Sequence, residues 1–527
     1  MHGMLSMLMN RSCLALPTLL LGILMHLIIS MKGETILSLF GAEEEYRLSP
    51  SVDPVGLEQH SSHNRCDFQH DPRSMFKRIE YCDIIIIGAG SGGSTTAARL
   101  CQKGSNKSRI CLLEAGGGDS NSDGGIHPSA SKEASRWWTA EVDFPLPDRS
   151  VIRTLTFVGG RVLGGSSRVN GRYWMDINIS AAGDYFNVAN DYIESIVGFT
   201  NSSLNIQWEP LASLRDIPDS MVAVVSNLGG LTPGPTPSLV PHPPTVVASM
   251  PRVSSCLDMS GRPDAFKCST GVYHNVDVFA NTTVTSLALD AATGLVTAAE
   301  TDDVSFRGDQ FIFSAGALGS PRLLLRSGLI TEAVGLREHV YLPLLFAFDD
   351  PTCLKHPEEI FVFHQQWELI FGWYCEDGIS HMRIYAILLH PTKEGRISSD
   401  RIVWNPLESD TDINAFIDII RLLYNTLVPL DKVLGFSLPP SAVDDDLTLR
   451  RYIYTRLALW QHPCCSLINA TLPSNILLGD LSSLPMHLIP PHPDSAARLA
   501  GAIAADRLLN QVSVCLSLLL CYLSPLV

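Results

Sequence analysis

The chain has 527 residues, of which 46% are hydrophobic and 17% are charged, and its formal net charge is −16. This composition allows two or three packed units and excludes an intrinsically disordered polymer. The acidic balance, with no concentration of Lys and Arg, disfavours nucleic acid as a partner because phosphate binding depends on basic side chains.

The N-terminal residues are typical of a targeting segment. A mostly apolar run from Leu14 to Ile29 follows Arg11, which predicts a signal peptide or anchor over residues 1–32. Export also fits five later Asn-x-Ser/Thr glycan acceptor sites, beyond the apolar run, at Asn106, Asn178, Asn201, Asn281 and Asn469. We therefore expect a secreted or membrane-attached protein that passes through the secretory pathway.

The thirteen cysteines include no Cys-x-x-Cys pair. This pattern favours a few disulfides or buried free thiols over a metal site, and Cys256 with Cys268 is one plausible loop-closing pair. We expect no bound metal.

The first folded elements follow a polar stretch over residues 33–78 that is typical of a linker. The aliphatic run Asp83–Ile87 predicts a buried parallel strand, and Ser94–Gln102 has the composition of a helix. A second short strand is predicted over Arg109–Glu114. Together these segments predict one βαβ unit.

A glycine-rich loop lies between the first strand and the helix, with the sequence Gly88-Ala89-Gly90-Ser91-Gly92-Gly93. In this G-x-G-x-x-G pattern Gly88 permits a tight turn, and Gly90 lets a pyrophosphate approach the main chain. Gly93 allows the helix to pack closely. Glu114 ends the second strand, where its carboxylate can accept hydrogen bonds from ribose hydroxyls and would repel a 2′-phosphate. The loop therefore predicts a dinucleotide other than NADP, without choosing between FAD and NAD.

The later elements alternate between sheet and helix. Residues 201–251 are rich in Pro, Ser and Thr and predict irregular structure, whereas residues 276–304 and 311–313 predict strands. Helical spacing recurs over residues 412–427, 445–460 and 495–509. The apolar tail, residues 512–527, is compatible with a membrane attachment or with a buried C-terminal helix.

Two later segments resemble family signatures. The segment Gly159-Gly160-Arg161-Val162-Leu163-Gly164-Gly165-Ser166-Ser167-Arg168-Val169-Asn170-Gly171 resembles the first signature of the glucose–methanol–choline (GMC) oxidoreductases. The segment from Gly316 to Leu329 is similar to the second signature and departs from it at Ile330, where glycine is usual. The resemblance runs from about Tyr81 to Leu509, and it is strong in these motifs and weak between them.

The resemblance implies an α/β fold in which a Rossmann-like FAD-binding domain is assembled from several segments. These segments are residues 79–175, 251–335 and 462–511. The substrate domain, residues 336–461, is expected to be α+β with an antiparallel sheet, and residues 176–250 are expected to form a substrate-domain or irregular excursion.

The resemblance also implies FAD as cofactor. The residues it assigns to FAD contacts, beyond Gly88, Gly90, Gly93 and Glu114, are Arg161, Gly164, Gly165, Ser166, Asn170, Gly171, Val284 and Asp480. The residues themselves support part of this, because Gly164 to Ser167 offer unhindered N–H groups and hydroxyls for a pyrophosphate or flavin edge. A flexible linker at this segment and a core valine at Val284 are the structural alternatives.

The expected reaction is oxidation of a small-molecule alcohol, with oxygen or another electron acceptor. The segment Trp460-Gln461-His462-Pro463 resembles the stretch that carries the family's active-site histidine, so His462 is the candidate base. His492 falls at the second active-site position and is expected to help hold the alkoxide.

The chain departs from the family pattern after His462. Cys464-Cys465-Ser466-Leu467 replaces the usual small residues and Gly-Thr, and only seventeen residues separate His462 from Asp480. Three alternatives therefore remain open: an FAD-binding protein without turnover, a non-enzymatic secreted scaffold, and a hydroxynitrile lyase-type activity.

Overall fold

The structure is a computed structural model of the chain. It describes residues 77–103, 108–117, 137–145, 152–168, 173–202, 206–207, 226–228, 232–233, 246–248, 252–253, 275–348, 360–404, 406–429, 433–438 and 440–523. The expected targeting segment, nearly all of the linker, the Cys256–Cys268 pair, Asn106, Asn170 and Gly171 lie outside these residues and stay predictions.

The first folded unit is built on a βαβ arrangement, as the sequence predicts. Strand β1 (Arg78–Ile87) is followed by helix α2 (Ser91–Lys103) and strand β2 (Ile110–Leu113), and the two strands pair in parallel. The helix begins at Ser91, three residues before the predicted start at Ser94. Its first turn contains Gly92 and Gly93, and at Gly93 a Cβ atom would lie 1.9 Å from the Gly88 carbonyl oxygen. The two glycines therefore let the helix start pack close to the first strand. The helix thus begins earlier in the sequence than its composition alone predicts.

The sheet of this unit has seven strands, in the order β10-β11-β12-β1-β2-β9, with β22 beside β12. The added strands are β9 (Val276–Phe279), β10 (Ser286–Leu289), β11 (Val296–Glu300), β12 (Val304–Phe313) and β22 (Ile476–Leu478). The parallel core, β22-β12-β1-β2-β9, combines segments that are hundreds of residues apart. The predicted assembly of the Rossmann-like domain from several segments is confirmed.

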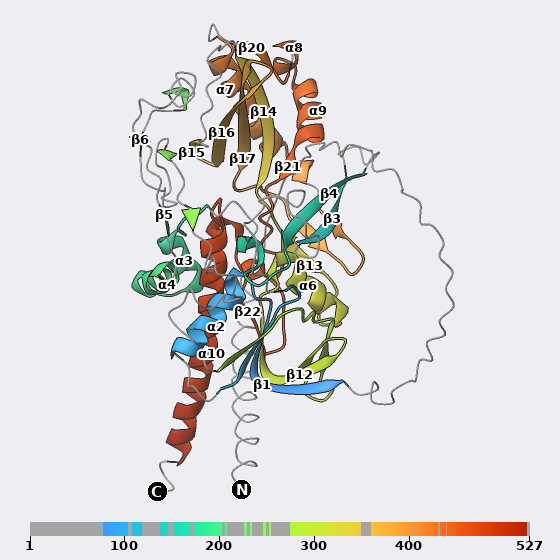
Figure 1. The fold of residues 1–527 in the computed structure, drawn as a ribbon, viewed down its shortest axis with the longest axis vertical. Helices are drawn as coiled ribbons and strands as arrows, with labels where there is room; N and C mark the ends of the chain where they lie inside the picture. Colours follow the sequence, from blue (N-terminus) through green and yellow to red (C-terminus); the bar gives the residue numbers. More distant parts are fainter. Residues whose placement is uncertain are drawn as a thin grey trace, which may run out of the picture.

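Helix α10 (Asp494–Leu523) packs along α2 on this sheet (Figure 1). The two helices approach so closely that a Cβ atom at Gly501 would lie 2.1 Å from the Gly92 carbonyl oxygen. Helix α6 (Gly316–Arg326) follows β12. Within the described residues, no helix is long and apolar enough to cross a membrane.

The expected excursion over residues 176–250 begins with two regular helices, α3 (Ile179–Phe186) and α4 (Asn190–Ser202). They pack against α10, which lies on the parallel sheet, and the expected domain boundaries stay predictions. Ile193 and Ile196 of α4 share a buried cluster with Leu499 and Ile503 of α10. This burial of apolar surface explains why the segment lies here.

The second unit contains an eight-stranded, mostly antiparallel sheet, in the order β20-β14-β17-β16-β15-β7-β6, with β21 beside β14 (Figure 1). The strands are β6 (Thr232–Pro233), β7 (Val246–Ala248), β14 (Val340–Phe348), β15 (Ile360–His364), β16 (Trp367–Glu376), β17 (Ile379–Leu388), β20 (Val433–Phe436) and β21 (Ala458–Leu459). The predicted α+β domain with an antiparallel sheet is confirmed.

Helices α7 (Asp410–Leu427), α8 (Pro440–Val443) and α9 (Asp446–Arg456) accompany this sheet. Side chains of α7 pack on it, as the ring contact between Phe416 and Trp367 shows, with centroids 5.0 Å apart. The predicted helix over residues 445–460 is too long at its C-terminal end. The chain becomes extended at Leu457 because Ala458 and Leu459 pair with β14 instead.

Smaller elements complete the fold. A five-stranded sheet contains β13 (Ala333–Leu336), β18 (Gly395–Ile397), β19 (Ile402–Val403), β3 (Trp137–Pro145) and β4 (Ile152–Gly160). Strands β5 (Ile206–Gln207) and β8 (Arg252–Val253) form a separate pair. The 3-10 helices are η3 (Gly165–Arg168), η6 (Pro406–Glu408), η7 (Leu481–Ser483) and η8 (Met486–Leu488).

Candidate active site

The glycine loop connects β1 to α2 at the carboxyl end of the parallel sheet. Gly88 has φ +100°, and a Cβ atom there would lie 2.4 Å from the Ser314 carbonyl oxygen. Its N–H donates to the Leu113 carbonyl of β2 at 2.8 Å. Only glycine fits this position, so the predicted tight turn at Gly88 has a direct structural basis.

The two glycine segments singled out in the sequence meet in space. The Gly164 N–H donates to the Ala89 carbonyl at 2.8 Å. A Cβ atom at Gly165 would lie 2.8 Å from Gly90 Cα, whereas one at Gly90 would lie 3.9 Å from Gly165 Cα. The facing main chains are therefore free of side chains, as close approach of a pyrophosphate requires.

Glu114 lies at the end of β2 beside this loop and is buried. Its Oε2 accepts a hydrogen bond from the Ala89 N–H at 2.9 Å, and its Oε1 accepts one from the Gly116 N–H at 2.9 Å. Burial raises the pKa of the carboxyl group, and these hydrogen bonds oppose that shift. The expected ribose-binding carboxylate thus lies at the edge of the glycine cradle.

The other predicted cofactor contacts surround the same edge. Arg161 is exposed, and its Nη2 donates to Thr283 Oγ1 at 3.2 Å, next to the partly buried Val284. Ser166 Oγ accepts a hydrogen bond from the Gly160 N–H at 3.1 Å. Their contacts with a cofactor stay predictions.

Asp480 is buried and already has protein donors at both carboxylate oxygens. Oδ2 accepts from the Gly316 N–H at 2.8 Å and from Ser320 Oγ at 2.6 Å, and Oδ1 accepts from the Ser482 N–H at 2.8 Å. The carboxylate therefore links the start of α6 to η7. A cofactor contact at Asp480 stays a prediction.

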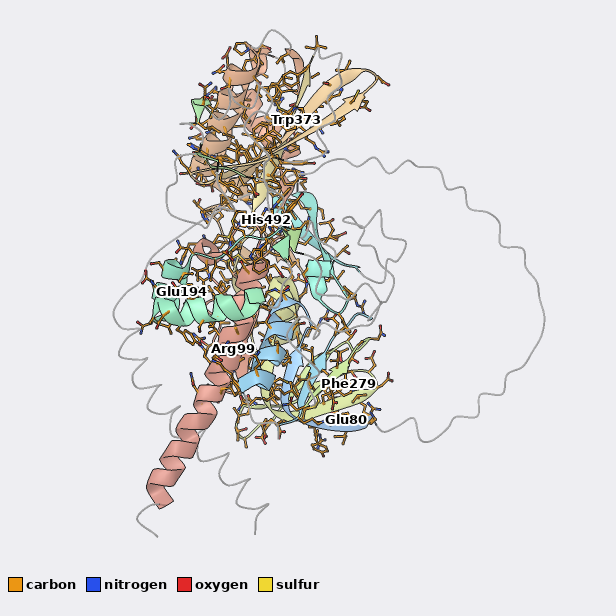
Figure 2. The ribbon with its side chains drawn as sticks, turned by 60° about the vertical axis from the view of Figure 1, so that its left-hand side comes forward. Glu80, Arg99, Glu194, Phe279, Trp373 and His492 are labelled. Atoms are coloured by element: carbon orange, nitrogen blue, oxygen red, sulfur yellow. A yellow bond between two sulfur atoms is a disulfide. The ribbon has the colours of Figure 1, made fainter. Side chains whose placement is uncertain are left out.

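The two predicted catalytic histidines lie together. The ring centroids of His462, which follows β21, and His492, which precedes α10, are 6.1 Å apart. Figure 2 shows His492 where the antiparallel-sheet unit meets the parallel-sheet unit. The two histidines thus lie close together although the sequence between His462 and Asp480 is short.

Three buried ionisable residues accompany the histidines and were missed by sequence reasoning: Glu338, His339 and Glu368. His339 Nδ1 lies 3.4 Å from His462 Nδ1, and Glu338 Oε1 accepts a hydrogen bond from the His462 N–H at 2.9 Å. The sequence feature that could have identified them is an ionisable residue beside or within an apolar strand. Glu338-His339 directly precede an apolar strand, and Glu368 interrupts another.

Glu368 contacts the second histidine. Its Oε1 lies 2.9 Å from His492 Nε2, and both residues are buried. Within the described part of the chain, Glu368 Oε2, Glu338 Oε2 and His339 Nε2 are buried without a hydrogen-bond partner. A buried polar atom without a partner is costly and calls for a physical explanation, of which a catalytic role is one.

Burial shifts the pKa values of His462, His339 and Glu338. It lowers the pKa of His462 to about 3, and the neighbouring His492 adds to the shift. Burial likewise lowers the pKa of His339 well below its usual value and raises that of Glu338 well above it. His462 and His339 are therefore neutral near pH 7, and a neutral imidazole can accept a proton.

Aromatic rings border the histidines. The Tyr173 and Phe361 rings lie 5.2 and 6.1 Å from the His492 ring, and the Trp460 ring lies 6.3 Å from the His462 ring. Among the described residues, no group of three His, Cys, Asp or Glu side chains is arranged to hold a metal ion.

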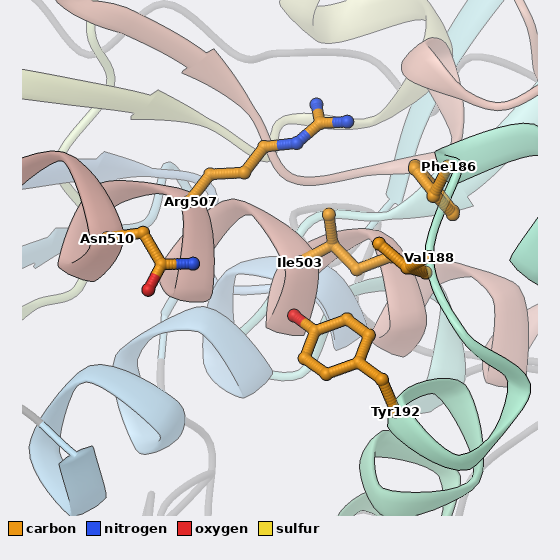
Figure 3. A pocket seen from close by; sticks show the side chains of 6 residues that line it. All are labelled: Phe186, Val188, Tyr192, Ile503, Arg507 and Asn510. Carbon is orange, nitrogen blue, oxygen red and sulfur yellow. The ribbon is translucent and has the colours of Figure 1, made fainter.

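A cavity of about 220 Å³ lies elsewhere, between the α3–α4 region and α10 (Figure 3). Its lining residues are Phe186, Val188, Tyr192, Ile503, Arg507 and Asn510. None of these is a predicted site residue.

Comparison with known proteins gives a partial sequence match. No family model matches the chain. A stretch of 101 residues is 34% identical to the oxygen-dependent choline dehydrogenase of Rhizobium rhizogenes and 33% identical to that of Sinorhizobium medicae. In both cases the match covers 18% of this chain and 17% of the enzyme, so the chain aligns with about a sixth of these relatives.

Solved structures match over a much larger part of the fold. Pyridoxine 4-oxidase from Mesorbium loti superposes with a TM-score of 0.63 at 19% identity, covering 81% of this chain and 99% of that one. Aspergillus oryzae formate oxidase gives 0.60 at 15% identity, over 81% and 98%. A fungal aryl-alcohol oxidase gives 0.55 at 15% identity, also over 81% and 98%.

The chain resembles the GMC oxidoreductases in its fold and in this short stretch of sequence. Its GMC fold brings both signature segments to the parallel sheet, since Gly165 faces Gly90 and Gly316 donates to Asp480. The histidine cluster lies at the junction with the antiparallel sheet. The GMC resemblance stated from the motifs alone is confirmed.

Proposed function

We propose that this protein is an FAD-dependent oxidoreductase that oxidises the CH–OH group of an alcohol. One observation carries the proposal: a side-chain-free backbone cradle and a buried histidine pair occur in one GMC fold. Two glycine segments form the cradle, and His462 and His492 lie 6.1 Å apart at the junction of the units.

The residues present fit the diphosphate and adenosine parts of FAD. The loop from Gly88 to Gly93 and the segment from Gly164 to Ser166 would hold the pyrophosphate through main-chain N–H groups at the start of α2. Glu114 would accept hydrogen bonds from the ribose hydroxyls, because each carboxylate oxygen has lone-pair capacity beyond its present bond.

When bound, FAD supplies the acceptor for the hydride that leaves the alcohol carbon. His462 would take the hydroxyl proton on its imidazole, which is neutral near pH 7. His492, oriented by Glu368, would hold the alcohol oxygen in place. The rings of Tyr173 and Trp460 would exclude water from the reacting groups.

The relatives support the reaction class. The partial match is to enzymes named choline dehydrogenases, and the similar structures include pyridoxine 4-oxidase and an aryl-alcohol oxidase. We propose a small-molecule alcohol as the substrate and oxygen or another compound as the electron acceptor.

We also propose that the protein is exported. Cys82 and Cys111 form a disulfide that links β1 to β2 in the core of the parallel sheet. Disulfides of this structural kind are typical of oxidising compartments. Treatment of protein from a eukaryotic host with an N-glycosidase should increase its mobility on a denaturing gel; an unchanged mobility and free thiols at Cys82 and Cys111 would contradict export.

Purification followed by an absorption spectrum and an alcohol panel tests the proposed function. We expect flavin bands in the purified protein and consumption of oxygen, or of an added dye acceptor, with at least one primary or secondary alcohol. Flavin bands without turnover would favour the inactive FAD-binding protein. A folded, colourless protein that retains no added FAD would favour the non-enzymatic scaffold.

A further inference from the structure

His462 lies between two residues with a left-handed backbone. Gln461 has φ +70° and Cys465 has φ +72°. Residues other than glycine rarely adopt this conformation, and they keep it only where their surroundings hold it. Separate contacts do so on each side of His462.

On the N-terminal side, the Gln461 side chain is fixed to strand β4. Its Oε1 accepts a hydrogen bond from the Val158 N–H at 2.7 Å, and its Nε2 donates to the Thr156 carbonyl at 3.2 Å. This amide pairs with the strand as another strand would, and it fixes where the chain turns toward His462.

On the C-terminal side, a disulfide joins the consecutive residues Cys464 and Cys465. Both residues are buried, and Cys464 Sγ lies 3.5 Å from Met486 Sδ. A bond between neighbouring side chains closes a small ring that includes the peptide between them. The ring restricts the backbone two residues after His462.

The hydrogen bonds of this pair reach the segment of Glu338 and His339 and the turn at Asp480. Cys464 and Arg337 exchange two backbone hydrogen bonds, of 2.9 and 3.1 Å, and Arg337 directly precedes Glu338 and His339. The Cys465 N–H donates to the Leu481 carbonyl at 2.9 Å, next to Asp480. The disulfide thus lies where these segments cross.

We infer that the Cys464–Cys465 disulfide is a positioning element that holds the His462 imidazole against His339 and His492. The inference rests on the proposed function for its catalytic meaning. It also accounts for the departure from the family pattern, because a covalent ring stands where relatives usually have small residues and Gly-Thr. The pair would fix this backbone within the shortened interval before Asp480.

The first test is direct detection of the bond. Mass spectrometry of an unreduced digest, with free thiols blocked while the protein is unfolded in denaturant, should give a peptide spanning Cys464 and Cys465 that is lighter by two hydrogen atoms than its reduced form. Blocked thiols at both positions would overturn the inference.

The second test compares two disulfide deletions. The double variant Cys464→Ala/Cys465→Ala should lower kcat roughly 100-fold with little change in KM, because small displacements of a catalytic group have effects of this size. Its acid limb of kcat/KM should move to higher pH as water reaches His462. The matched control, Cys82→Ala/Cys111→Ala, should lower the unfolding temperature and leave that limb in place.

A third variant separates backbone conformation from general destabilisation. Cys464→Ala/Cys465→Gly should recover part of the lost rate, because glycine adopts the left-handed conformation without a Cβ penalty. No recovery relative to the alanine pair, together with equal unfolding temperatures, would contradict positioning through this backbone.

A measurement that does not require catalytic turnover tests this inference separately from the proposed function. The rate at which diethyl pyrocarbonate modifies His462, measured by peptide mass spectrometry, should rise in the alanine pair because the imidazole becomes more accessible, and it should stay unchanged in the control. Faster modification in a protein that oxidises no alcohol would support positioning and refute only the proposed function. Equal rates and an unmoved pH limb would overturn the inference.

Discussion

The Nε2 atom of His492 lies 2.9 Å from Oε1 of Glu368, and both side chains are buried at the junction of the two sheets. This contact joins two residues that are far apart in the sequence, because Glu368 lies in β16 and His492 precedes α10. It fixes one ring nitrogen of His492, so the orientation of the imidazole is set before a substrate arrives.

Replacing Glu368 should reduce turnover more than binding. Glu368→Ala removes the partner of His492, and we expect kcat to fall about 100-fold, the scale of a general acid–base contribution. Glu368→Gln keeps an acceptor oxygen and should lose less. Steady-state kinetics with a responsive alcohol measures both variants. Glu376→Gln, at the exposed end of the same strand, is the control, and an equal loss in all three would contradict a specific role.

The pH profile should report the burial of His462. A base must be unprotonated, and the pKa of His462 is lowered from 6.5 to about 3. We therefore expect kcat/KM to stay level as the pH falls through 6.5 and to decline only toward about 3. Rapid pH-jump assays with circular dichroism as the control for folding measure this. If kcat/KM instead declined near pH 6.5, and His462→Gln removed that decline, a buried and neutral His462 base would be contradicted.

The same burial should make the fold sensitive to acid. In the unfolded chain His462 and His339 bind protons below about 6.5, whereas the folded state does not until much lower pH. Stability is therefore lost as the pH falls below 6.5. Thermal unfolding scans should show the melting temperature falling in that range, with a smaller slope in His339→Phe. A slope equal to the wild type in that variant would count against burial of His339.

Two neighbouring glycines should respond differently to alanine. At Gly93 a Cβ atom would lie 1.9 Å from the Gly88 carbonyl oxygen, so Gly93→Ala should cost about 3 kcal/mol of unfolding free energy. At Gly90 the nearest atom is 3.9 Å away, so Gly90→Ala should fold normally and weaken FAD binding at least about tenfold by filling the cradle. Denaturant unfolding and FAD titration measure these effects. Unchanged FAD affinity in Gly90→Ala would place the cofactor elsewhere.

Much of this arrangement could be predicted from the sequence. The Asp83–Ile87 run, the glycine loop and Glu114 predicted the βαβ unit because local patterns define it. Helix ends were less accessible: the chain leaves α9 at Leu457 because β14 offers pairing partners to Ala458 and Leu459. A local pattern holds no information about such a distant strand.

The histidine cluster shows the same limit. His462 and His492 were identified by resemblance, whereas Glu368 lies 124 residues before His492 and His339 lies 123 residues before His462. Nothing in the local sequence says that Glu368 faces His492. The meeting of Gly90 with Gly165 was likewise implied only by the family pattern.

A buried ion pair should stabilise the contact between α2 and α10. Arg99 Nε and Nη2 donate to the Asp506 carboxylate at 3.0 and 2.7 Å, and both side chains are buried. Asp506→Ala should lower the unfolding free energy by about 3–5 kcal/mol because it removes the carboxylate that accepts two hydrogen bonds from a buried guanidinium. The exposed pair of Arg109 with Asp277 is the control, and Asp277→Ala should cost at most about 1 kcal/mol. Equal effects in urea unfolding would contradict this difference.

We propose that a cofactor held by the glycine cradle reacts with an alcohol beside His462. The most direct measurement is the absorption of FAD-loaded protein mixed rapidly with alcohol in the absence of oxygen. We predict that the oxidised flavin bands disappear with the wild-type protein, more slowly when the alcohol carries deuterium at the reacting carbon, and that His462→Ala keeps its bands. Bands that persist in the wild-type protein with every alcohol, or that vanish equally fast in His462→Ala, would contradict the account.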